Sequence, residues 1–179
     1  MNVPKALDPA AALKSAMPDA LLDTKTFRDE LTLIVEPSRI PQILHYLRDT
    51  QGLIYNFLSD ISTVDYYPET RMDGQRYGLS YHLYSMLYNR RLRVKVYLFE
   101  DDVTVPSCTE VFPGANWLER EAYDMMGIVF EGHPDLRRVL MPDDWDGHPH
   151  RRDYPLGYEQ IMFSFNVEDI AKHKPFAKE

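Results

Sequence analysis

The chain has 179 residues, and its 28 acidic side chains outnumber 20 basic ones, which gives a formal net charge of -8 at pH 7. This length predicts one domain with some additional chain, and the negative charge argues against a nucleic-acid-binding protein, which must neutralise phosphates. The single cysteine, Cys108, excludes an internal disulfide, a CxxC redox pair and an iron–sulfur cluster ligated by this chain alone. Neither a transmembrane stretch nor a targeting segment is visible in the sequence, so membrane association is expected only through a partner.

The first fifty residues predict one strand and one helix. Residues 1–20 hold several prolines and alanines and predict a weak helix or a loose N-terminal arm. The apolar run at 31–35 predicts a strand, and Ser38 is a suitable N-cap for a helix that ends near Gly52. Four apolar residues share one face of this helix: Ile40, Ile43, Leu44 and Leu47.

The middle of the chain predicts three strands. Residues 53–64 are rich in β-branched and aromatic side chains, and 65–76 have the composition of an exposed loop. Residues 77–88 and 92–98 alternate in polarity on either side of a tight-turn candidate at Asn89-Arg90, which predicts a hairpin. Five residues share the core-facing side of its first strand: Leu79, Tyr81, Leu83, Ser85 and Leu87. Because the other face is partly charged, we expect helices on one face only.

A further helix is predicted to begin at Asn116, which has capping-box spacing to Glu119, and to end at Gly127. Its apolar stripe consists of Leu118, Ala122 and Met125. The opposite side carries Trp117, Arg120, Glu121 and Asp124. Together these elements predict an α+β fold, a two-layer domain over 21–130 with helices packed on one face of a mixed or antiparallel sheet.

After residue 130 the composition changes. Residues 131–179 contain five prolines and three glycines among apolar residues such as Trp145, without a sustained helical or strand period. Structureless segments of this length are uncommon inside a compact domain. We therefore expect residues 131–179 to form an extended C-terminal strap that docks over its own domain or over a neighbouring subunit, which points to assembly.

Two sets of residues could carry chemistry, and each has a structural alternative. The first is a set of carboxylates around Arg120, namely Glu119, Glu121 and Asp124. It could serve acid–base catalysis or form a charged helix face. The second is a set of possible zinc or iron ligands, namely His133, His148, His150 and Asp153. Prolines adjacent to these histidines favour a role in turns instead.

Two arginine pairs, Arg137-Arg138 and Arg151-Arg152, could recognise carboxylates or phosphates through their guanidinium groups. Because acidic residues are interleaved with them, ion pairs within or between subunits are the alternative. Cys108 could act as a nucleophile or could be a buried inert thiol, since no histidine adjoins it in the sequence.

A gapped string of charged and apolar residues carries a family resemblance. Its members are Glu119, Arg120, Glu121, Asp124, Met125, Met126, His133 and Arg137. A second block lies at 146–156, and a strand segment lies at 81–85. In all three the chain resembles the 30 kDa subunit family of NADH-quinone oxidoreductase (respiratory complex I), and the resemblance extends over residues 30–158.

The resemblance implies a subunit of the peripheral arm, on the cytoplasmic face of the bacterial inner membrane, that binds no cofactor itself. It implies packing against the quinone-site subunit, which is of the 49 kDa type, with the C-terminal segment running over that neighbour, while FMN and Fe-S clusters reside on other subunits. The complex transfers electrons from NADH to quinone and pumps protons. Related complexes with other electron donors contain equivalent subunits, so the donor stays open.

We expect no catalytic, cofactor-binding or metal-binding residues, and an interface formed by the family signature and the strap. The expected interface residues are Glu119, Arg120, Glu121, Asp124, His133, Arg137, Arg138, His148, Arg151, Arg152 and Asp153. Glu121 and Asp124 should face either Arg137 or Arg138 of this chain or basic residues of the partner. The alternatives are a metal-dependent enzyme that uses His133, His148 and His150, and direct contact with the membrane, which the negative charge disfavours.

Overall fold

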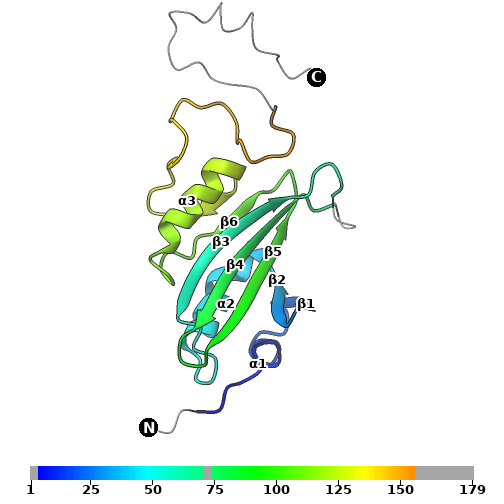
Figure 1. Ribbon diagram of the computed structural model, residues 1–179, viewed down its shortest axis with the longest axis vertical. Coiled ribbons are helices and arrows are strands. Elements are labelled where there is room, and N and C mark those ends of the chain that lie inside the picture. The colour runs from blue at the N-terminus through cyan, green and yellow to red at the C-terminus, as the bar shows by residue number, and fades with distance from the viewer. Residues whose placement is uncertain (1–3, 71–73, 156–179) are drawn as a thin grey trace, which may run out of the picture.

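The computed structural model describes residues 4–70 and 74–155 (Figure 1). In chain order the elements are α1 (Pro9–Ala16), β1 (Leu21–Phe27), β2 (Glu30–Val35), the 3-10 helix η1 (Pro37–Arg39), α2 (Ile40–Asp49), β3 (Phe57–Asp65), β4 (Tyr77–Ser85), β5 (Arg90–Leu98), β6 (Thr104–Pro106), α3 (Ala115–Met126) and β7 (Val129–Glu131).

Strands β1 to β5 form one mixed sheet in the order β1-β2-β5-β4-β3. β2 and β5 are parallel neighbours, with Leu33 opposite Val94, whereas the other neighbouring strands of this sheet are antiparallel. β6 and β7 form a separate parallel pair. The expected α+β fold, with helices and a mixed sheet, is confirmed.

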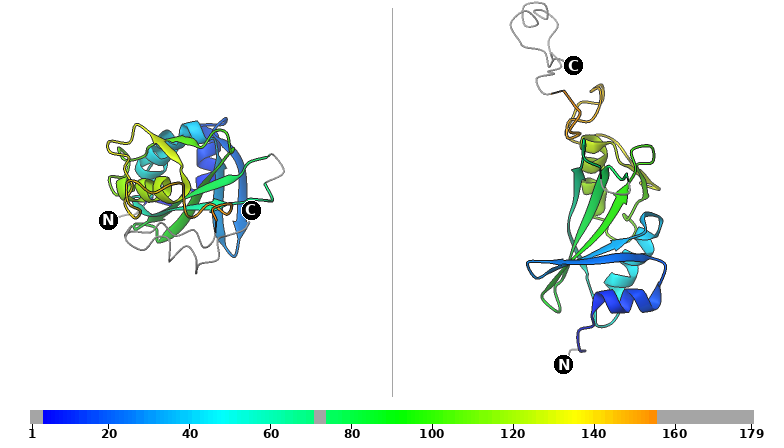
Figure 2. Two further views of the ribbon diagram at one scale, coloured as in Figure 1. Left: turned by 90° about the horizontal axis from the view of Figure 1, so that it is seen from above. Right: turned by 90° about the vertical axis from the view of Figure 1, so that its right-hand side faces the viewer.

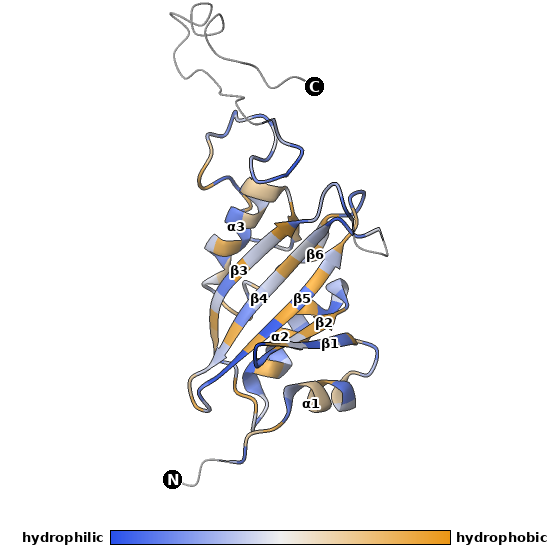
Figure 3. Cartoon of the chain, turned by 45° about the vertical axis from the view of Figure 1, so that its right-hand side comes forward, coloured by the Kyte–Doolittle hydropathy of each residue, from blue (hydrophilic) through white to orange (hydrophobic). Residues whose placement is uncertain are grey.

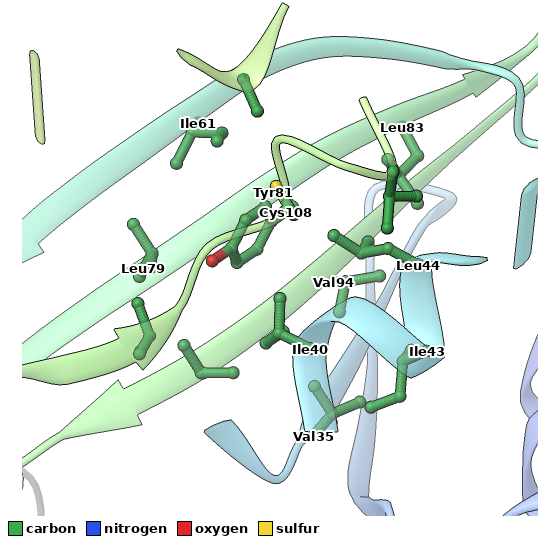
Figure 4. Close-up of a cluster of buried hydrophobic side chains, with 14 of the residues drawn as sticks. Val35, Ile40, Ile43, Leu44, Ile61, Leu79, Tyr81, Leu83, Val94 and Cys108 are labelled. Atoms are coloured by element: carbon green, nitrogen blue, oxygen red, sulfur yellow. The ribbon is translucent and has the colours of Figure 1, made fainter. Parts of the chain in front are cut away.

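Helix α2 packs its apolar face against the sheet, as its residue spacing predicts. The four apolar residues of that face are fully buried: Ile40, Ile43, Leu44 and Leu47. They belong to a buried cluster that includes Tyr81 and Val94 of the sheet (Figure 4). Burial of each such side chain is worth about 1.5–3 kcal/mol, so this cluster fixes the helix. Ser38 lies in η1 and is not the N-cap.

Residues 9–16 form helix α1, which is the helix alternative for residues 1–20 rather than the loose arm. Oδ1 of Asp8 accepts a 3.0 Å hydrogen bond from the N–H of Ala10, and Pro9 occupies the first turn, where its missing N–H costs nothing. Leu13 is fully buried in the core. Two buried residues, Pro9 and Leu13, together with a good N-cap therefore dock this short helix.

Strand β1 was not predicted, and it forms an exposed hairpin with β2. Its burial pattern has no apolar alternation, because every residue after Leu21 is exposed. The turn between the strands places Arg28 and Asp29 at positive φ (49° and 64°). In Figure 2 (right) this hairpin projects beyond the rest of the sheet. Backbone pairing with β2, rather than burial of side chains, holds β1 in place.

The predicted hairpin of β4 and β5 is confirmed, and its apolar and polar residues alternate along β5 in Figure 3. β4 ends at Ser85, so Leu87 lies in the exposed turn and not on the core-facing side. β3 begins at Phe57 and not at residue 53. The predicted exposed loop 65–76 is wrong at both ends, because Asp65 and Arg76 are buried.

Helix α3 starts one residue earlier than predicted, with Gly114 as its N-cap, so Asn116 and Glu119 form no capping box. Gly127 ends the helix in the left-handed conformation (φ 77°), as predicted. Residues 132–155 contain turns and bends but neither a helix nor a strand. The rest of the predicted strap, 156–179, lies outside the described residues.

Candidate docking site at the end of helix α3

The described part of the strap, residues 131–155, folds over the C-terminal end of α3 (Figures 1 and 2). Asp124 is at the centre of this contact and its side chain is fully buried. Oδ1 of Asp124 accepts a 2.7 Å hydrogen bond from Nη1 of Arg138. Oδ2 accepts three backbone N–H groups at 2.9, 2.7 and 2.9 Å, those of Val139, Leu140 and Met141. Successive N–H groups of this kind form a nest for an anion, so one carboxylate fixes the strap at 138–141.

Arg138 extends this contact to a second part of the strap. Its Nη1 also donates to the backbone carbonyl of Asp124 at 3.2 Å. Its Nη2 donates to the carbonyls of Trp145 and Gly147 at 3.0 Å each. A planar guanidinium presents several fixed donors, and here it joins the helix to residues on both sides of a strap loop.

The last carbonyls of α3, which have no partner within the helix, are satisfied by the strap. Nδ1 of His148 donates to the carbonyl of Asp124 at 3.0 Å, and the N–H of His150 donates to that of Met125 at 3.0 Å. Nε of Arg151 donates to the carbonyl of Met126 at 2.8 Å. A cation is favourable at this end of the helix dipole, so the strap serves as the C-terminal cap of α3.

Glu119 faces inward and connects α3 to the loop before it. Its Oε1 accepts the N–H of Cys108 at 2.7 Å, and its Oε2 accepts the hydroxyl of Ser107 at 2.7 Å. Burial, followed by the charge of Glu119, raises the pKa of the Cys108 thiol well above its usual value. The thiol therefore stays protonated, which favours the buried, inert cysteine over the nucleophile.

Arg120 is buried under the strap. Its Nε donates to the carbonyl of Arg137 at 3.1 Å, and its Nη2 donates to that of Arg138 at 3.3 Å. Its guanidinium lies 4.9 Å from the ring centroid of Trp117, within cation–π range. The polar side of α3 is therefore only partly solvated, because the strap covers Arg120 and Asp124 while Trp117 and Glu121 stay exposed.

The rings of two strap histidines, His133 and His148, form hydrogen bonds to the backbone. Nε2 of His133 donates to the carbonyl of Asn116 at 3.2 Å, and its Nδ1 accepts the N–H of Asp135 at 3.0 Å. These contacts, and that of His148 with the end of the helix, favour a role of the histidines in turns over a role as metal ligands. Over residues 4–70 and 74–155 there is no group of three or more His, Cys, Asp or Glu that could hold a metal ion.

Four of the expected interface residues are exposed: Glu121, Arg137, Arg152 and Asp153. Arg137 forms a 2.7 Å surface ion pair with Asp135. Glu121 is exposed and makes no ion pair with the described part of the chain. Arg152 is exposed as well, and its N–H donates to Oδ2 of Asp65 at 2.9 Å. These charges are available to another protein.

Two large apolar side chains beside the anchored strap are also exposed. Trp117 on α3 is 65% exposed, and Leu140 on the strap is 61% exposed. Leu140 lies within the turn that Asp124 fixes, so its side chain is presented by a rigid backbone. Tryptophan is enriched among the residues that dominate protein interfaces, and exposed apolar side chains that lie together mark interaction sites.

A second cluster, which the sequence did not reveal, holds Asp153. Arg76 is buried and pairs with three carboxylates, those of Asp65 at 2.9 Å, Glu100 at 2.5 Å and Asp153 at 2.7 Å. These four residues are distant in sequence, so no local spacing could have indicated them. Polar residues such as Asp65 and Arg76 are ordinary in a loop that is predicted to be exposed, so the sequence contains no signal of their pairing.

Both buried carboxylates on which the strap rests are ionised. Burial raises the pKa of Asp124, but hydrogen bonds from Met141, Arg138 and the neighbouring N–H groups outweigh it and hold the pKa below its usual value. The same balance applies to Asp65, where hydrogen bonds from Arg76 and from backbone N–H groups outweigh burial. The hydrogen bond from Arg76 lowers the pKa of Asp153. The arrangement therefore binds and positions the chain through charge, rather than storing a proton.

The sequence of the chain is similar to one family throughout this region. Residues 33–160 match the family described as the respiratory-chain NADH dehydrogenase 30 kDa subunit. An NADH-quinone oxidoreductase subunit from Roseiflexus castenholzii is 48% identical over 169 residues, which cover 94% of this chain and 95% of that protein. The corresponding NADH-quinone oxidoreductase subunit from Herpetosiphon aurantiacus is 43% identical over 150 residues, covering 84% and 85% of the two chains.

Two solved structures are similar in fold. A trypsin-resistant fragment of Nqo5 superposes with a TM-score of 0.58 at 34% identity, over 70% of this chain and 97% of that one. A chain of the archaeal membrane-bound sulfane sulfur reductase superposes with a TM-score of 0.67 at 21% identity, over 94% and 93%, which shows the fold alone. Within the described residues, every helix is too short or too polar to cross a membrane.

Proposed function

Since this chain belongs to the 30 kDa subunit family of respiratory-chain NADH dehydrogenases, we propose that it is an assembly subunit that docks on the 49 kDa type quinone-site subunit. It serves in the peripheral arm of an NADH-quinone oxidoreductase and contributes no catalytic residue. Electrons pass from NADH through FMN and Fe-S clusters on other subunits to quinone. The complex lies on the cytoplasmic face of the bacterial inner membrane, which this chain reaches only through its partners.

The anchoring of the strap by Asp124 is the observation that supports docking most strongly. A flexible segment loses conformational entropy when it binds, whereas a pre-ordered one does not. Asp124 and Arg138 hold 138–147 on the helix end, and Leu140 is presented outward from this rigid turn. The family signature thus supports a docking surface rather than a catalytic centre.

NADH is the electron donor that the relatives favour, because the similar proteins are subunits of NADH-quinone oxidoreductase. The similarity to the sulfane sulfur reductase chain extends to the fold alone and favours no other donor. The metal-dependent enzyme has less support, because His133 and His148 use ring nitrogens to bind backbone carbonyls.

Purification of the tagged chain from its native membrane tests this function. We expect the quinone-site subunit, FMN and Fe-S clusters to co-purify with the tagged chain, and we expect the chain expressed alone to carry none of these cofactors. Recovery of the chain without other subunits of the oxidoreductase would contradict the proposal. Stoichiometric zinc or iron in the chain expressed alone would support the metal-dependent enzyme instead.

A further inference from the structure

Arg76 joins the strap to the sheet. It lies just before β4, and its side chain is only 2% exposed. Nε and Nη2 contact the two carboxylate oxygens of Asp65, at the end of β3, at 3.1 and 2.9 Å. This bidentate pair lies within the sheet and compensates the buried guanidinium charge without help from the strap.

Asp153 adds a separate contact from the strap. Its Oδ1 lies 2.7 Å from Nη2 of Arg76, and its side chain is 41% exposed. The preceding residue reinforces the contact, because the N–H of Arg152 donates to Oδ2 of Asp65 at 2.9 Å. The strap therefore contacts both members of the buried pair, once through a side chain and once through the backbone.

These contacts lie directly after the strap residues that cap α3. His148 and Arg151 bond to the last carbonyls of the helix, and Asp153 follows two residues later on the sheet. Residues 148–153 are thus held at one end by the helix and at the other by the sheet. Neither attachment involves another protein.

We propose that Arg76 is a latch that holds the strap on the sheet in the free subunit, so that the strap is positioned before the partner binds. The inference rests on the proposed function for its purpose, since a positioned strap is useful only if it docks. The latch itself is a property of the isolated chain. Arg76 acts here as a positioning residue: it touches Asp153, and Asp153 places residues 152–155.

Glu100 supplies a matched control. It also pairs with Arg76, at 2.5 Å, but it follows β5 and its side chain is 66% exposed. Asp153→Asn and Glu100→Gln each remove one partly exposed carboxylate from the same guanidinium and leave the pair with Asp65 intact. Only the first change releases the strap.

Amide hydrogen exchange on the isolated chain tests the latch. We measure the N–H groups of Arg152 and Tyr154, which donate to Asp65 and to the carbonyl of Arg151, each relative to its intrinsic exchange rate. Asp153→Asn should speed their exchange about fivefold, the effect expected for one partly exposed charged contact. Glu100→Gln should change it less than about twofold, and each variant should lose no more than about 1 kcal/mol of unfolding free energy.

Unchanged exchange in Asp153→Asn, or equal acceleration in both variants, would overturn the latch. Binding of the wild-type chain to immobilised quinone-site subunit from the same organism is measured in parallel. Failure of the wild type to bind would contradict the proposed function, while the exchange result would still decide the latch. Binding by the wild type with a slower association rate for Asp153→Asn would support both.

Discussion

Asp124 Oδ1 lies 2.7 Å from Nη1 of Arg138, and this buried ion pair joins the last turn of α3 to the strap. The same carboxylate accepts three backbone N–H groups through its other oxygen. Asp124 belongs to the family signature, and in this fold its role is to fix the path of the chain after the helix. The charged residues of this signature therefore connect α3 to the strap.

Replacing Asp124 by Ala should lower the free energy of unfolding by about 3 kcal/mol or more, because it leaves the guanidinium of Arg138 and three N–H groups without their acceptor. Chemical denaturation of the isolated chain measures the change. Glu121→Gln, on the exposed side of the same helix, is the control and should stay within about 0.5 kcal/mol of the wild type. Equal effects of the two changes would contradict the assignment.

Substitutions of the two adjacent arginines should have different effects, because Arg138 contributes to the stability of the chain and Arg137 to its binding to the partner. Arg138→Ala removes a side chain that binds Asp124 and two strap carbonyls, so it should destabilise the isolated chain by about 3 kcal/mol. Within the described residues the side chain of Arg137 forms an exposed pair with Asp135, so Arg137→Ala should leave stability within about 1 kcal/mol yet weaken binding to the partner. Denaturation and pull-down measure the two effects. Normal assembly of Arg137→Ala would remove this residue from the interface.

Gly127→Ala should disturb the strap as well as the helix end. A Cβ there would lie 2.5 Å from Nη2 of Arg151 and 2.6 Å from the His148 ring, and the residue has φ 77°. Gly132 has a similar φ of 78°, but no atom of residues 4–70 or 74–155 lies within 4 Å of a Cβ added there. Gly132→Ala should therefore lower the free energy of unfolding by about 1–2 kcal/mol, the cost of the left-handed backbone alone. Gly127→Ala should lower it distinctly more. Equal losses of stability in the two variants, measured by thermal unfolding, would show that the strap does not pack closely against Gly127.

The stability contribution of Asp124 should disappear in acid. Its pKa is lowered in the folded chain relative to its usual value of 3.8. A carboxyl group of this kind stabilises the fold at pH values above its unfolded pKa, and the stabilisation is lost as the pH falls through the folded pKa. The difference in unfolding free energy between wild type and Asp124→Asn should be constant from pH 7 to about 5 and should shrink below about pH 4. A difference that does not change down to about pH 2.5 would contradict an ionised Asp124.

The sequence predicts the parts of the fold in which burial follows a local period. The β4–β5 hairpin and helix α2 alternate or repeat their apolar residues, and both are buried as expected. β1 escapes prediction because it is an exposed edge strand without a buried side, held by backbone pairing. Helix α1 is short and depends on the tertiary contact of Leu13, which no local pattern contains.

The candidate site was predictable in its membership but not in its geometry. Local spacing cannot distinguish a capping box from Glu119 turned inward toward Cys108, because both need only a carboxylate near the start of the helix. Asp124 was expected to face an arginine of this chain or a basic residue of the partner, and in the structure it pairs with Arg138. Arg76 could not be identified, since its partners lie 11 and 24 residues away, and in the strap.

Photo-cross-linking tests most directly whether the strap docks on the quinone-site subunit. A photoreactive phenylalanine analogue replaces Leu140, which is 61% exposed on the strap, or in a control Leu87, which is 51% exposed in the β4–β5 turn. After irradiation of native membranes, position 140 should cross-link to the quinone-site subunit and position 87 should not. Docking through the strap would be contradicted if the complex assembles but position 140 forms no cross-link to that subunit. It would also be contradicted if only position 87 forms one.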